Sequence, residues 1–335
     1  MRIPSLGAGL VLAAGAATAG NLPELTVITY DSFVSDWGPG PAVEAAFEET
    51  CACDLNFVAA GDGAALLARV KLEGERSEAD IVLGIDTNLT AEARATGLFA
   101  SHGRTVTGLD VPVPWEDETF LPYDWGYFAF VHDVSLESVP QSFGELADSD
   151  VTIIIQDPRS STPGLGLLLW VKTAYGDRAP EIWGALADNV VTVTPGWSEA
   201  YGMFLEGEAD MVLSYTTSPA YHLIAEGDAS KAAAPFSEGH YMQVEVAGKL
   251  ASTDQPELAD RFLAFMLTDA FQKIIPTTNW MYPAAIPDDG LPDGFETLIQ
   301  PARPLLLSAA EARAARAPAL NEWLNALSRN GRRVP

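Results

Sequence analysis

The sequence alternates short, β-branched runs with helix-like runs, and this alternation constrains the fold more than any other feature. Near the N-terminus the runs at 25–30, 54–60 and 79–85 are typical of strands, and the stretches between them suit helices. One of these helices is expected to begin after Asp62 and to stop at Gly74. A β-α-β-α-β order predicts a parallel sheet covered by helices. We therefore expect an α/β fold whose ligands bind beyond the carboxyl ends of its strands.

A second alternating set follows, with strands predicted at 151–158, 189–194 and 210–219 and helices predicted at 165–176 and 197–209. Two long extended runs, 120–133 and 239–250, flank this set. Such a pattern predicts two lobes joined by a two-stranded hinge. Lobe 1 would comprise residues 20–127 plus 246–335 and lobe 2 residues 128–245, with the ligand cleft between them.

The C-terminal region is expected to be helical. Residues 256–275 predict one long amphipathic helix, and residues 307–329 predict a second helix that Pro318 interrupts. The last six residues, 330–335, are expected to fray.

The N-terminus has the pattern of a secretory signal. Residues 1–19 contain an early base, Arg2, an apolar stretch through Ala14, and the small residues of an A-x-A cleavage site at Ala17–Ala19. No later stretch is apolar for the roughly 20 residues that a membrane span needs. We therefore expect cleavage and a soluble, exported mature protein. The formal net charge of −27 disfavours nucleic acid and anionic lipid as partners.

Cys51 and Cys53 are the only cysteines of the chain. An exported protein favours a disulfide, but the C-x-C spacing closes a very small ring. A local disulfide and a pair of buried thiols both remain open. A metal site built on the two cysteines would be incomplete, since no histidine is suitably spaced nearby.

The segment "DPRSSTPGLGLLLW" at 157–170 follows a predicted strand and opens a helix, an arrangement that suits an anion at the helix N-terminus. The alternative interpretation is that this segment presents a nucleophilic serine. However, Ser160, Ser161 and Ser214 do not lie in a G-x-S-x-G elbow. The histidines show no H-x-x-x-H spacing, and the glycines form neither a phosphate-binding P-loop nor a dinucleotide fingerprint. We expect no catalytic residue, no cofactor and no metal.

Aromatic side chains cluster where predicted strands and helices end, a placement that favours a binding cleft over a plain scaffold. The clusters contain Tyr30, Trp37, Trp197, Tyr215, Tyr221 and Trp280. Acidic residues are interleaved with them: Asp31, Asp36, Asp62 and Asp124. Aromatic faces bind flat rings and cations, whereas helix N-termini at 161–162 and 197–198 suit a phosphate or polar tail. The pattern predicts a flat, cationic, heteroaromatic ligand.

Several long motifs together resemble the periplasmic thiamine-binding proteins of bacterial ABC importers, over about residues 25–329. They include "LTVITYDSFVSDWGPG", "QDPRSSTPGLGLLLW", "TPGWSEAYGMFLEGEADMVLSYTTSPAYH", "FSEGHYMQVEVA" and "IPTTNWMYP". The resemblance implies a type II periplasmic-binding fold. It also implies capture of thiamine, thiamine monophosphate or thiamine diphosphate, and delivery to a membrane permease with a cytoplasmic ATPase. We expect a monomer.

The resemblance also assigns candidate ligand-binding residues. Family contacts carry over to Asp62, Gly63, Ser161, Thr162, Trp197, Tyr215, Thr216, Thr217 and Ser218. Tyr30, Trp37, Tyr221 and Trp280 lie in matching motifs and are expected to complete the aromatic walls.

Two alternatives share the fold that the resemblance implies. Thiaminase I cleaves thiamine through a cysteine nucleophile, but Cys51 and Cys53 lie in a helical segment away from the predicted cleft. Ferric-binding relatives use adjacent tyrosines, whereas Tyr215 and Tyr221 are six residues apart and are not part of a Tyr-Tyr pair. Another cationic or heterocyclic ligand is the remaining alternative.

Overall fold

The computed structural model describes residues 22–329. The predicted signal peptide, 1–19, and the predicted frayed tail, 330–335, lie outside the described residues. Within the described part of the chain, no helix is both long and apolar enough to cross a bilayer.

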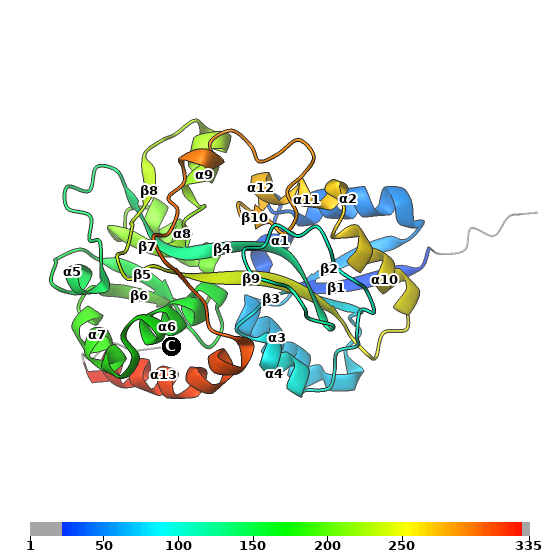
Figure 1. Ribbon diagram of the computed structural model, residues 1–335, viewed down its shortest axis with the longest axis horizontal. Coiled ribbons are helices and arrows are strands. Elements are labelled where there is room, and N and C mark those ends of the chain that lie inside the picture. Colours follow the sequence, from blue (N-terminus) through cyan, green and yellow to red (C-terminus); the bar gives the residue numbers. More distant parts are fainter. Residues whose placement is uncertain (1–21, 330–335) are drawn as a thin grey trace, which may run out of the picture.

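One sheet runs through the whole molecule (Figure 1). Its main strands are β1 (Glu24–Thr29), β2 (Asp54–Ala59), β3 (Ile81–Asp86), β4 (Phe120–Asp133), β5 (Ile153–Gln156), β6 (Val190–Thr194), β7 (Met211–Tyr215) and β9 (His240–Lys249). They follow the order β2-β1-β3-β9-β4-β7-β5-β6. Three short strands attach beside this path: β8 (Lys231–Ala233) and β10 (Tyr282–Pro283) pair with β4, and β11 (Pro304–Leu305) pairs with β9.

The first half has the predicted parallel alternation, since β1 pairs in parallel with both β2 and β3. Its helices are α1 (Asp31–Val34), α2 (Gly40–Cys51), α3 (Gly63–Glu73) and α4 (Thr90–Ala95). The Asp62 side chain caps α3 by accepting the backbone N–H of Gly63, and Gly74 ends the helix, as the sequence predicts.

The second half repeats the arrangement, with β5 parallel to both β6 and β7. Its helices are α5 (Phe143–Ala147), α6 (Thr162–Tyr175), α7 (Ala179–Leu186), α8 (Trp197–Leu205) and α9 (Pro219–Tyr221), which a π-helical turn (His222–Glu226) follows. Short 3-10 turns lie at Gly74–Arg76, Gly176–Arg178 and Phe295–Thr297. Helix α6 starts three residues earlier than its pattern predicts, because the Ser161 hydroxyl accepts the backbone N–H of Gly164 and caps it.

The two long extended runs are β4 and β9, which pair antiparallel with each other. On its other side β9 pairs antiparallel with β3, and β4 pairs antiparallel with β7. Figure 1 shows the pair running across the middle of the molecule from one half to the other. All ten residues of β9 are buried. This pair therefore has the place that the sequence assigns to a two-stranded hinge.

The C-terminal helices differ from the sequence prediction in two respects. Residues 256–275 do not form one helix but α10 (Pro256–Phe265), α11 (Asp269–Gln272) and α12 (Ile275–Thr278). Helix α10 ends because Thr268 is extended, with φ −90° and ψ 157°, and its hydroxyl donates to the carbonyl of Phe265.

The final helix, α13 (Ala309–Arg329), continues through Pro318, so the predicted interruption is wrong. Pro318 is exposed, as is Ala314 four residues earlier, and water can reach the carbonyl that loses its N–H partner. The helix packs against α6 and α7 and also contacts α4.

Cys51 and Cys53 form a disulfide bond, which settles the alternative that the sequence leaves open. The bond closes the C-terminal end of α2, where Ala52 adopts the left-handed conformation with φ 52°. The side chains of both cysteines are buried in the apolar core beneath α2.

Helix α6 lies tightly against the crossing strand β4. A Cβ atom added to Gly166 would lie 2.0 Å from Cε2 of Phe128, well inside van der Waals contact. Gly166 is therefore a packing requirement, and the spaced glycines of "TPGLGLL" need no phosphate to explain them.

We predict that Gly166→Ala lowers the free energy of unfolding by about 1–3 kcal/mol, because the methyl group overpacks the α6–β4 contact. Urea denaturation followed by circular dichroism measures the change. Gly184→Ala is the matched control: Gly184 is exposed in α7 and an added Cβ meets nothing within 4 Å. That control should be neutral or stabilising by up to about 1 kcal/mol. Equal stability of the two variants would contradict the assignment.

Candidate functional site

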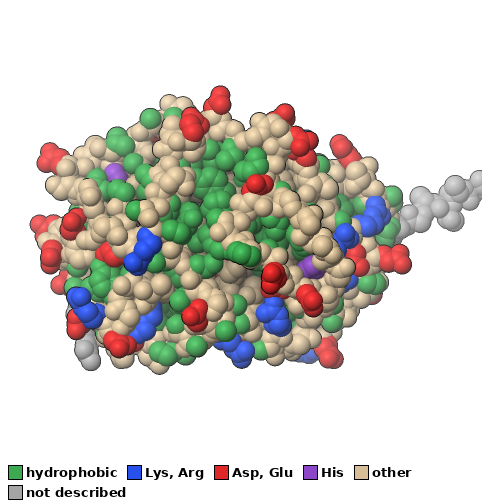
Figure 2. Space-filling model, in the orientation of Figure 1, with side chains coloured by type: hydrophobic (Ala, Val, Ile, Leu, Met, Phe, Trp, Pro, Cys, Tyr) green, Lys and Arg blue, Asp and Glu red, His purple; other side chains and the backbone are tan. Residues whose placement is uncertain are grey.

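A cavity of about 520 Å³ opens at the carboxyl ends of β1, β2, β6 and β7. This is where the sequence places a ligand, because parallel strands deliver their following loops to one edge of a sheet. Figure 2 shows apolar side chains gathered near the middle of one face of the molecule and acidic side chains scattered around its margin.

Eight of the thirteen predicted site residues line this cavity. Tyr30, Trp37, Asp62 and Trp197 contribute to its wall, as do Tyr215, Ser218, Tyr221 and Trp280. The other five do not line it: Gly63, Ser161, Thr162, Thr216 and Thr217 are all buried. The structure thus brings together the aromatic clusters that are dispersed along the sequence.

One wall is a stack of rings. The indole of Trp197 stacks on the phenol of Tyr201 at 5.0 Å between ring centroids, and Trp37 lies 6.2 Å from Trp197. The indole N–H of Trp197 donates to the hydroxyl of Ser214 at 2.8 Å. The last ring of the stack is His222, which lies 5.9 Å from Tyr201.

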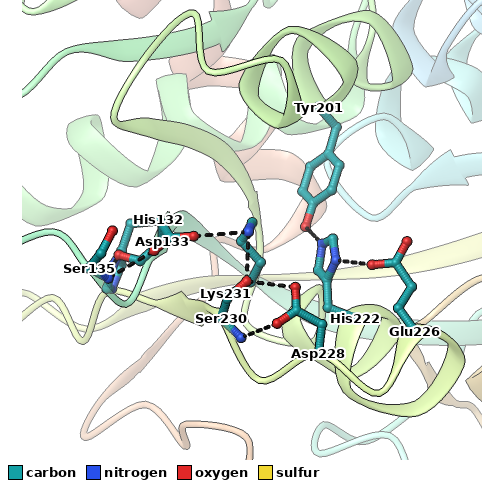
Figure 3. A network of polar contacts seen from close by, with 9 residues as sticks. All are labelled: His132, Asp133, Ser135, Tyr201, His222, Glu226, Asp228, Ser230 and Lys231. Atoms are coloured by element: carbon teal, nitrogen blue, oxygen red, sulfur yellow. Dashed lines mark hydrogen bonds and ion pairs between the residues drawn. The ribbon is translucent and has the colours of Figure 1, made fainter.

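His222 holds this wall from behind (Figure 3). Its Nε2 atom lies 2.9 Å from the Tyr201 hydroxyl, and its Nδ1 atom lies 2.7 Å from a carboxylate oxygen of Glu226. The possible ligand atoms of His222, Glu226 and Asp228 lie within 4.8 Å of one another, which is a spacing suited to a metal. Each already has protein partners, since Asp228 accepts from the N–H and the hydroxyl of Ser230. We interpret the cluster as a set of contacts that fixes the position of the Tyr201 ring.

Tyr221 and Trp280 form a further part of the wall: their rings meet edge-on at 5.4 Å, and Tyr221 also lies 4.8 Å from His222. Trp280 has φ 56°, a conformation that bulky side chains rarely adopt. The surrounding loop maintains this strained backbone at the edge of the cavity.

The carboxylate of Asp62 lies where three helices begin. It accepts the backbone N–H of Gly63 at 2.8 Å and the hydroxyl of Ser161 at 2.7 Å. Backbone N–H groups of Thr162 and Trp197 also hydrogen-bond to it and lower its pKa, although burial has the larger effect and raises the pKa overall. The N-termini of α3, α6 and α8 thus form an anion-binding site, and the carboxylate of Asp62 occupies it.

The two halves of the molecule also contact each other here, through the N-terminal ends of α3 and α6. A Cβ atom added to Gly63 would lie 2.2 Å from Oγ1 of Thr162. The backbone N–H of Ala65 donates to the carbonyl of Ser160 at 2.9 Å. Gly63, Ser161 and Thr162 therefore act here in the contact between α3 and α6.

The floor of the cavity is acidic and buried. Glu245 on β9 lines the cavity and accepts hydroxyl hydrogen bonds from Tyr123 at 2.7 Å and Tyr30 at 3.0 Å. Asp124 on β4 accepts an amide hydrogen bond from Asn279 at 2.6 Å. Burial raises the pKa of Glu245 to about 7, and burial and the Glu245 charge raise the pKa of Asp124 well above its usual value. Of the predicted acidic residues, Asp31 and Asp36 are exposed and do not line the cavity.

The sequence analysis missed other residues of the wall: Ser32, Tyr201, Gln243, Glu245, Asn279 and Met281. Signals for most of them were present. Tyr201 is four residues after Trp197 and shares its helix face. Gln243 and Glu245 alternate with apolar residues in β9, so both point to the same face of the sheet.

The site lacks the arrangement of a serine hydrolase. Among residues 22–329, no hydrogen bond joins Ser160, Ser161 or Ser214 to a histidine. The histidines other than His222 bond to backbone carbonyl groups: His102 to Asp117, His132 to Asp133 and His240 to Phe128.

Comparison with known proteins gives a consistent result. The family model for bacterial extracellular solute-binding proteins matches residues 38–273. A thiamine-binding periplasmic protein of Escherichia coli strain K12 is 56% identical over 310 residues, which cover 92% of this chain and 94% of the relative. Its counterpart in Brucella melitensis is 52% identical over 309 residues, covering 91% of this chain and 92% of the relative.

Solved structures agree with the fold that the resemblance implies. A periplasmic thiamin binding protein superposes with a TM-score of 0.89 at 54% identity, covering 95% of this chain and 99% of that protein. Iron-bound HitA from Pseudomonas aeruginosa superposes with a TM-score of 0.73 at 20% identity, covering 91% and 99% of the two chains, and shows the shared fold alone. The predicted type II periplasmic-binding fold is confirmed.

We predict that Ser161→Ala lowers the free energy of unfolding by about 1–3 kcal/mol, because it removes the cap of α6 and a hydrogen bond to Asp62. Chemical denaturation of the ligand-free protein measures the loss. Ser328→Ala is the control, since Ser328 is an exposed serine on α13, and its effect should stay within about 0.5 kcal/mol. If Ser161→Ala is as stable as the control, the hydroxyl does not have this role.

Proposed function

Because this chain belongs to the family of bacterial extracellular solute-binding proteins, we propose that it captures thiamine in the periplasm and delivers it to an ABC importer. The observation that carries the proposal is the aromatic-walled cavity with its acidic floor. Thiamine combines a flat aminopyrimidine with a permanently cationic thiazolium. Each ring contact with an aromatic wall contributes about 0.5–2 kcal/mol. The relatives at 52–56% identity are named as thiamine-binding periplasmic proteins.

Within this proposal the cavity residues have distinct roles. Trp37, Trp197, Tyr221 and Trp280 supply the aromatic faces that hold the two flat rings. Tyr30 and Tyr215 are bound to Glu245 and Gln243 of β9, and Ser218 is bound to the Ser214 hydroxyl that accepts from Trp197. Gly63, Ser161, Thr162, Thr216 and Thr217 contact ligand only through a rearrangement, since they do not line the cavity in this structure.

The transport cycle that we propose is a hinged clamp. Lobe 1 (20–127 and 246–335) and lobe 2 (128–245) would close about β4 and β9, and the permease would bind the closed, monomeric protein while a cytoplasmic ATPase drives import. A ligand favours closure only by binding the closed form more tightly. Helix α13, in the C-terminal part of lobe 1, contacts α4 of lobe 1 and α6 and α7 of lobe 2.

Binding without catalysis is the function that the cavity favours over a thiaminase. The cavity wall contains no cysteine, and Cys51 and Cys53 are joined in a disulfide within the core below α2. Iron binding is also disfavoured. The Tyr215 hydroxyl accepts from Gln243, and burial raises the pKa of Tyr215 well above its usual value, which opposes the phenolate that ferric iron needs.

Phosphorylated forms of thiamine require a change at Asp62. Their phosphate tail suits the N-termini of α3, α6 and α8, but the Asp62 carboxylate already occupies that site. We propose that a phosphate replaces this carboxylate, so that Asp62 biases the site toward unphosphorylated thiamine.

Calorimetric titration of the purified protein with thiamine and its phosphates tests the function directly. Absence of both binding heat and a thermal shift at micromolar ligand would overturn the proposal.

An assay for free pyrimidine and thiazole separates a binding protein from a thiaminase. A ferric titration, followed for a tyrosinate charge-transfer band, tests the iron alternative.

We predict that Trp197→Ala weakens thiamine binding at least about fivefold, the equivalent of 1 kcal/mol, because a stacking surface is lost. Trp197→Phe, which keeps an aromatic face and loses only the indole hydrogen bond to Ser214, should retain most of the affinity. Calorimetry measures both variants. Unchanged affinity of Trp197→Ala would remove this indole from the site.

We predict that Asp62→Asn shifts the preference toward thiamine monophosphate by about tenfold or more relative to thiamine, because a buried negative charge no longer opposes the phosphate. The ratio of the two dissociation constants measures the shift. Asp36→Asn removes one exposed charge beside Trp37 and serves as control for long-range attraction. A ratio that moves equally in both variants would reject the specific role of Asp62.

A further inference from the structure

Two carboxyl groups face each other at the centre of the molecule, where β4 and β9 pair. Asp124 on β4 is the register partner of Glu245 on β9. Asp124 is completely buried and Glu245 is 5% exposed. Glu245 lines the cavity, so the pair connects the hinge strands to the ligand site.

The groups around this pair are acids, phenols and amides. Tyr30 and Tyr123 donate to Glu245, and Asn279 donates to Asp124. The charge of Asp62 at the start of α3 raises the pKa of Glu245, and the charge of Glu245 in turn helps to raise the pKa of the neutral Tyr215 phenol at the end of β7. From β3, Asp86 is the other register partner of Glu245, and its carboxylate is bound by Asn88.

No positive charge balances the pair. Among residues 22–329, none of the ion pairs formed by Lys, Arg or His includes Asp124 or Glu245. Two ionised carboxylates side by side in a buried site repel each other and also lose hydration. The ligand-free pair is therefore expected to retain a proton, and the raised pKa values of both groups agree with this.

A second observation points to a ligand at the same place. Gln243 lies two residues before Glu245 on β9, is completely buried and lines the cavity. Its amide N–H donates to Tyr215, whereas its Oε1 atom has no partner. Oδ1 of Asp124 is also buried without a partner. Of these two atoms, Oε1 of Gln243 belongs to a residue that lines the cavity, and it is an unused acceptor that a cation or a donor from a ligand would satisfy.

We propose that the Asp124–Glu245 pair is a proton-releasing counter-ion for the cationic ring of the ligand. When the thiazolium enters above Glu245, its fixed positive charge stabilises the doubly ionised pair. The shared proton then leaves to bulk water, and the cavity gains one negative charge against the positive charge of the ligand. This inference rests on the proposed function and adds to it a linkage between binding and pH.

The linkage has a definite sign. Because the folded protein holds a proton that the unfolded chain releases more easily, Glu245 contributes stability below pH 4.5 that is lost as the pH rises to about 7 and above. Thiamine affinity should move in the opposite direction and increase as the pH rises through 7. A permanently charged ligand has no proton on its thiazolium to account for this change.

Calorimetry of thiamine binding at pH 7 in PIPES and in Tris measures the proton release, since the two buffers differ in ionisation enthalpy. The comparison ligand is the isostere with a neutral thiophene in place of the thiazolium, which keeps the aminopyrimidine. We expect thiamine to release up to about one proton more than the isostere. Equal proton exchange by the two ligands would overturn the inference.

Two variants separate the roles of the carboxyl groups. Glu245→Gln should weaken thiamine binding about tenfold or more, while affinity for the neutral isostere is retained and shows that the variant folds. Asp124→Asn removes one of the two carboxyl groups that share the proton, so thiamine should still bind but release less proton than in the wild type. Asp36→Asn, an exposed carboxyl outside the wall, should match the wild type. Wild-type thiamine affinity in Glu245→Gln would also reject the inference.

The outcomes distinguish this inference from the proposed function. If neither thiamine nor the isostere binds to the wild-type protein, the proposed function fails and the inference fails with it. If thiamine binds with the same proton exchange as the isostere, the function stands and only the proton linkage is rejected.

Discussion

The antiparallel pairing of β4 with β9 is the interaction on which the rest of the structure depends. Strand β9 pairs with β3 of the first half and β4 pairs with β7 of the second, so one continuous sheet joins the two parallel sets of strands. The same pair aligns the carboxyl ends of β1 and β2 with those of β6 and β7. A cavity between the halves exists only because this alignment brings four loops to one place.

The charges in the cavity follow from the same arrangement. Register pairing brings Asp124 beside Glu245, and within residues 22–329 neither forms an ion pair with a basic side chain, so the floor attracts positive charge. At another part of the cavity, the N-termini of α3, α6 and α8 converge and attract negative charge. The carboxylate of Asp62 already occupies that position. The protein thus has a site for a cation next to a site for an anion that is filled by its own side chain. A ligand with a cationic ring and a variable tail fits this division.

Sequence patterns predicted the alternating halves, the two crossing strands and most of the aromatic wall, because strand, helix and cap signals are local. They failed where the outcome depends on contacts. The run at 256–275 has one continuous apolar face, but Thr268 adopts an extended backbone and divides it. Pro318 was expected to interrupt a helix, but its exposed position allows water to compensate for the lost hydrogen bond. The acidic floor was missed because the pairing that brings Asp124 of β4 beside Glu245 of β9 joins residues far apart in the sequence.

The α/β class, the order of the elements and the aromatic and acidic character of the site can be predicted from the amino-acid sequence, because each depends on neighbours along the chain. Which of these residues meet depends on how the chain folds in three dimensions. Tyr30, Trp197, Tyr221 and Trp280 share one cavity, whereas Ser161 and Thr162 are held in a contact with α3. Burial also decided the pKa of Glu245, because the loss of hydration that raises it arises only when β9 lies between β3 and β4.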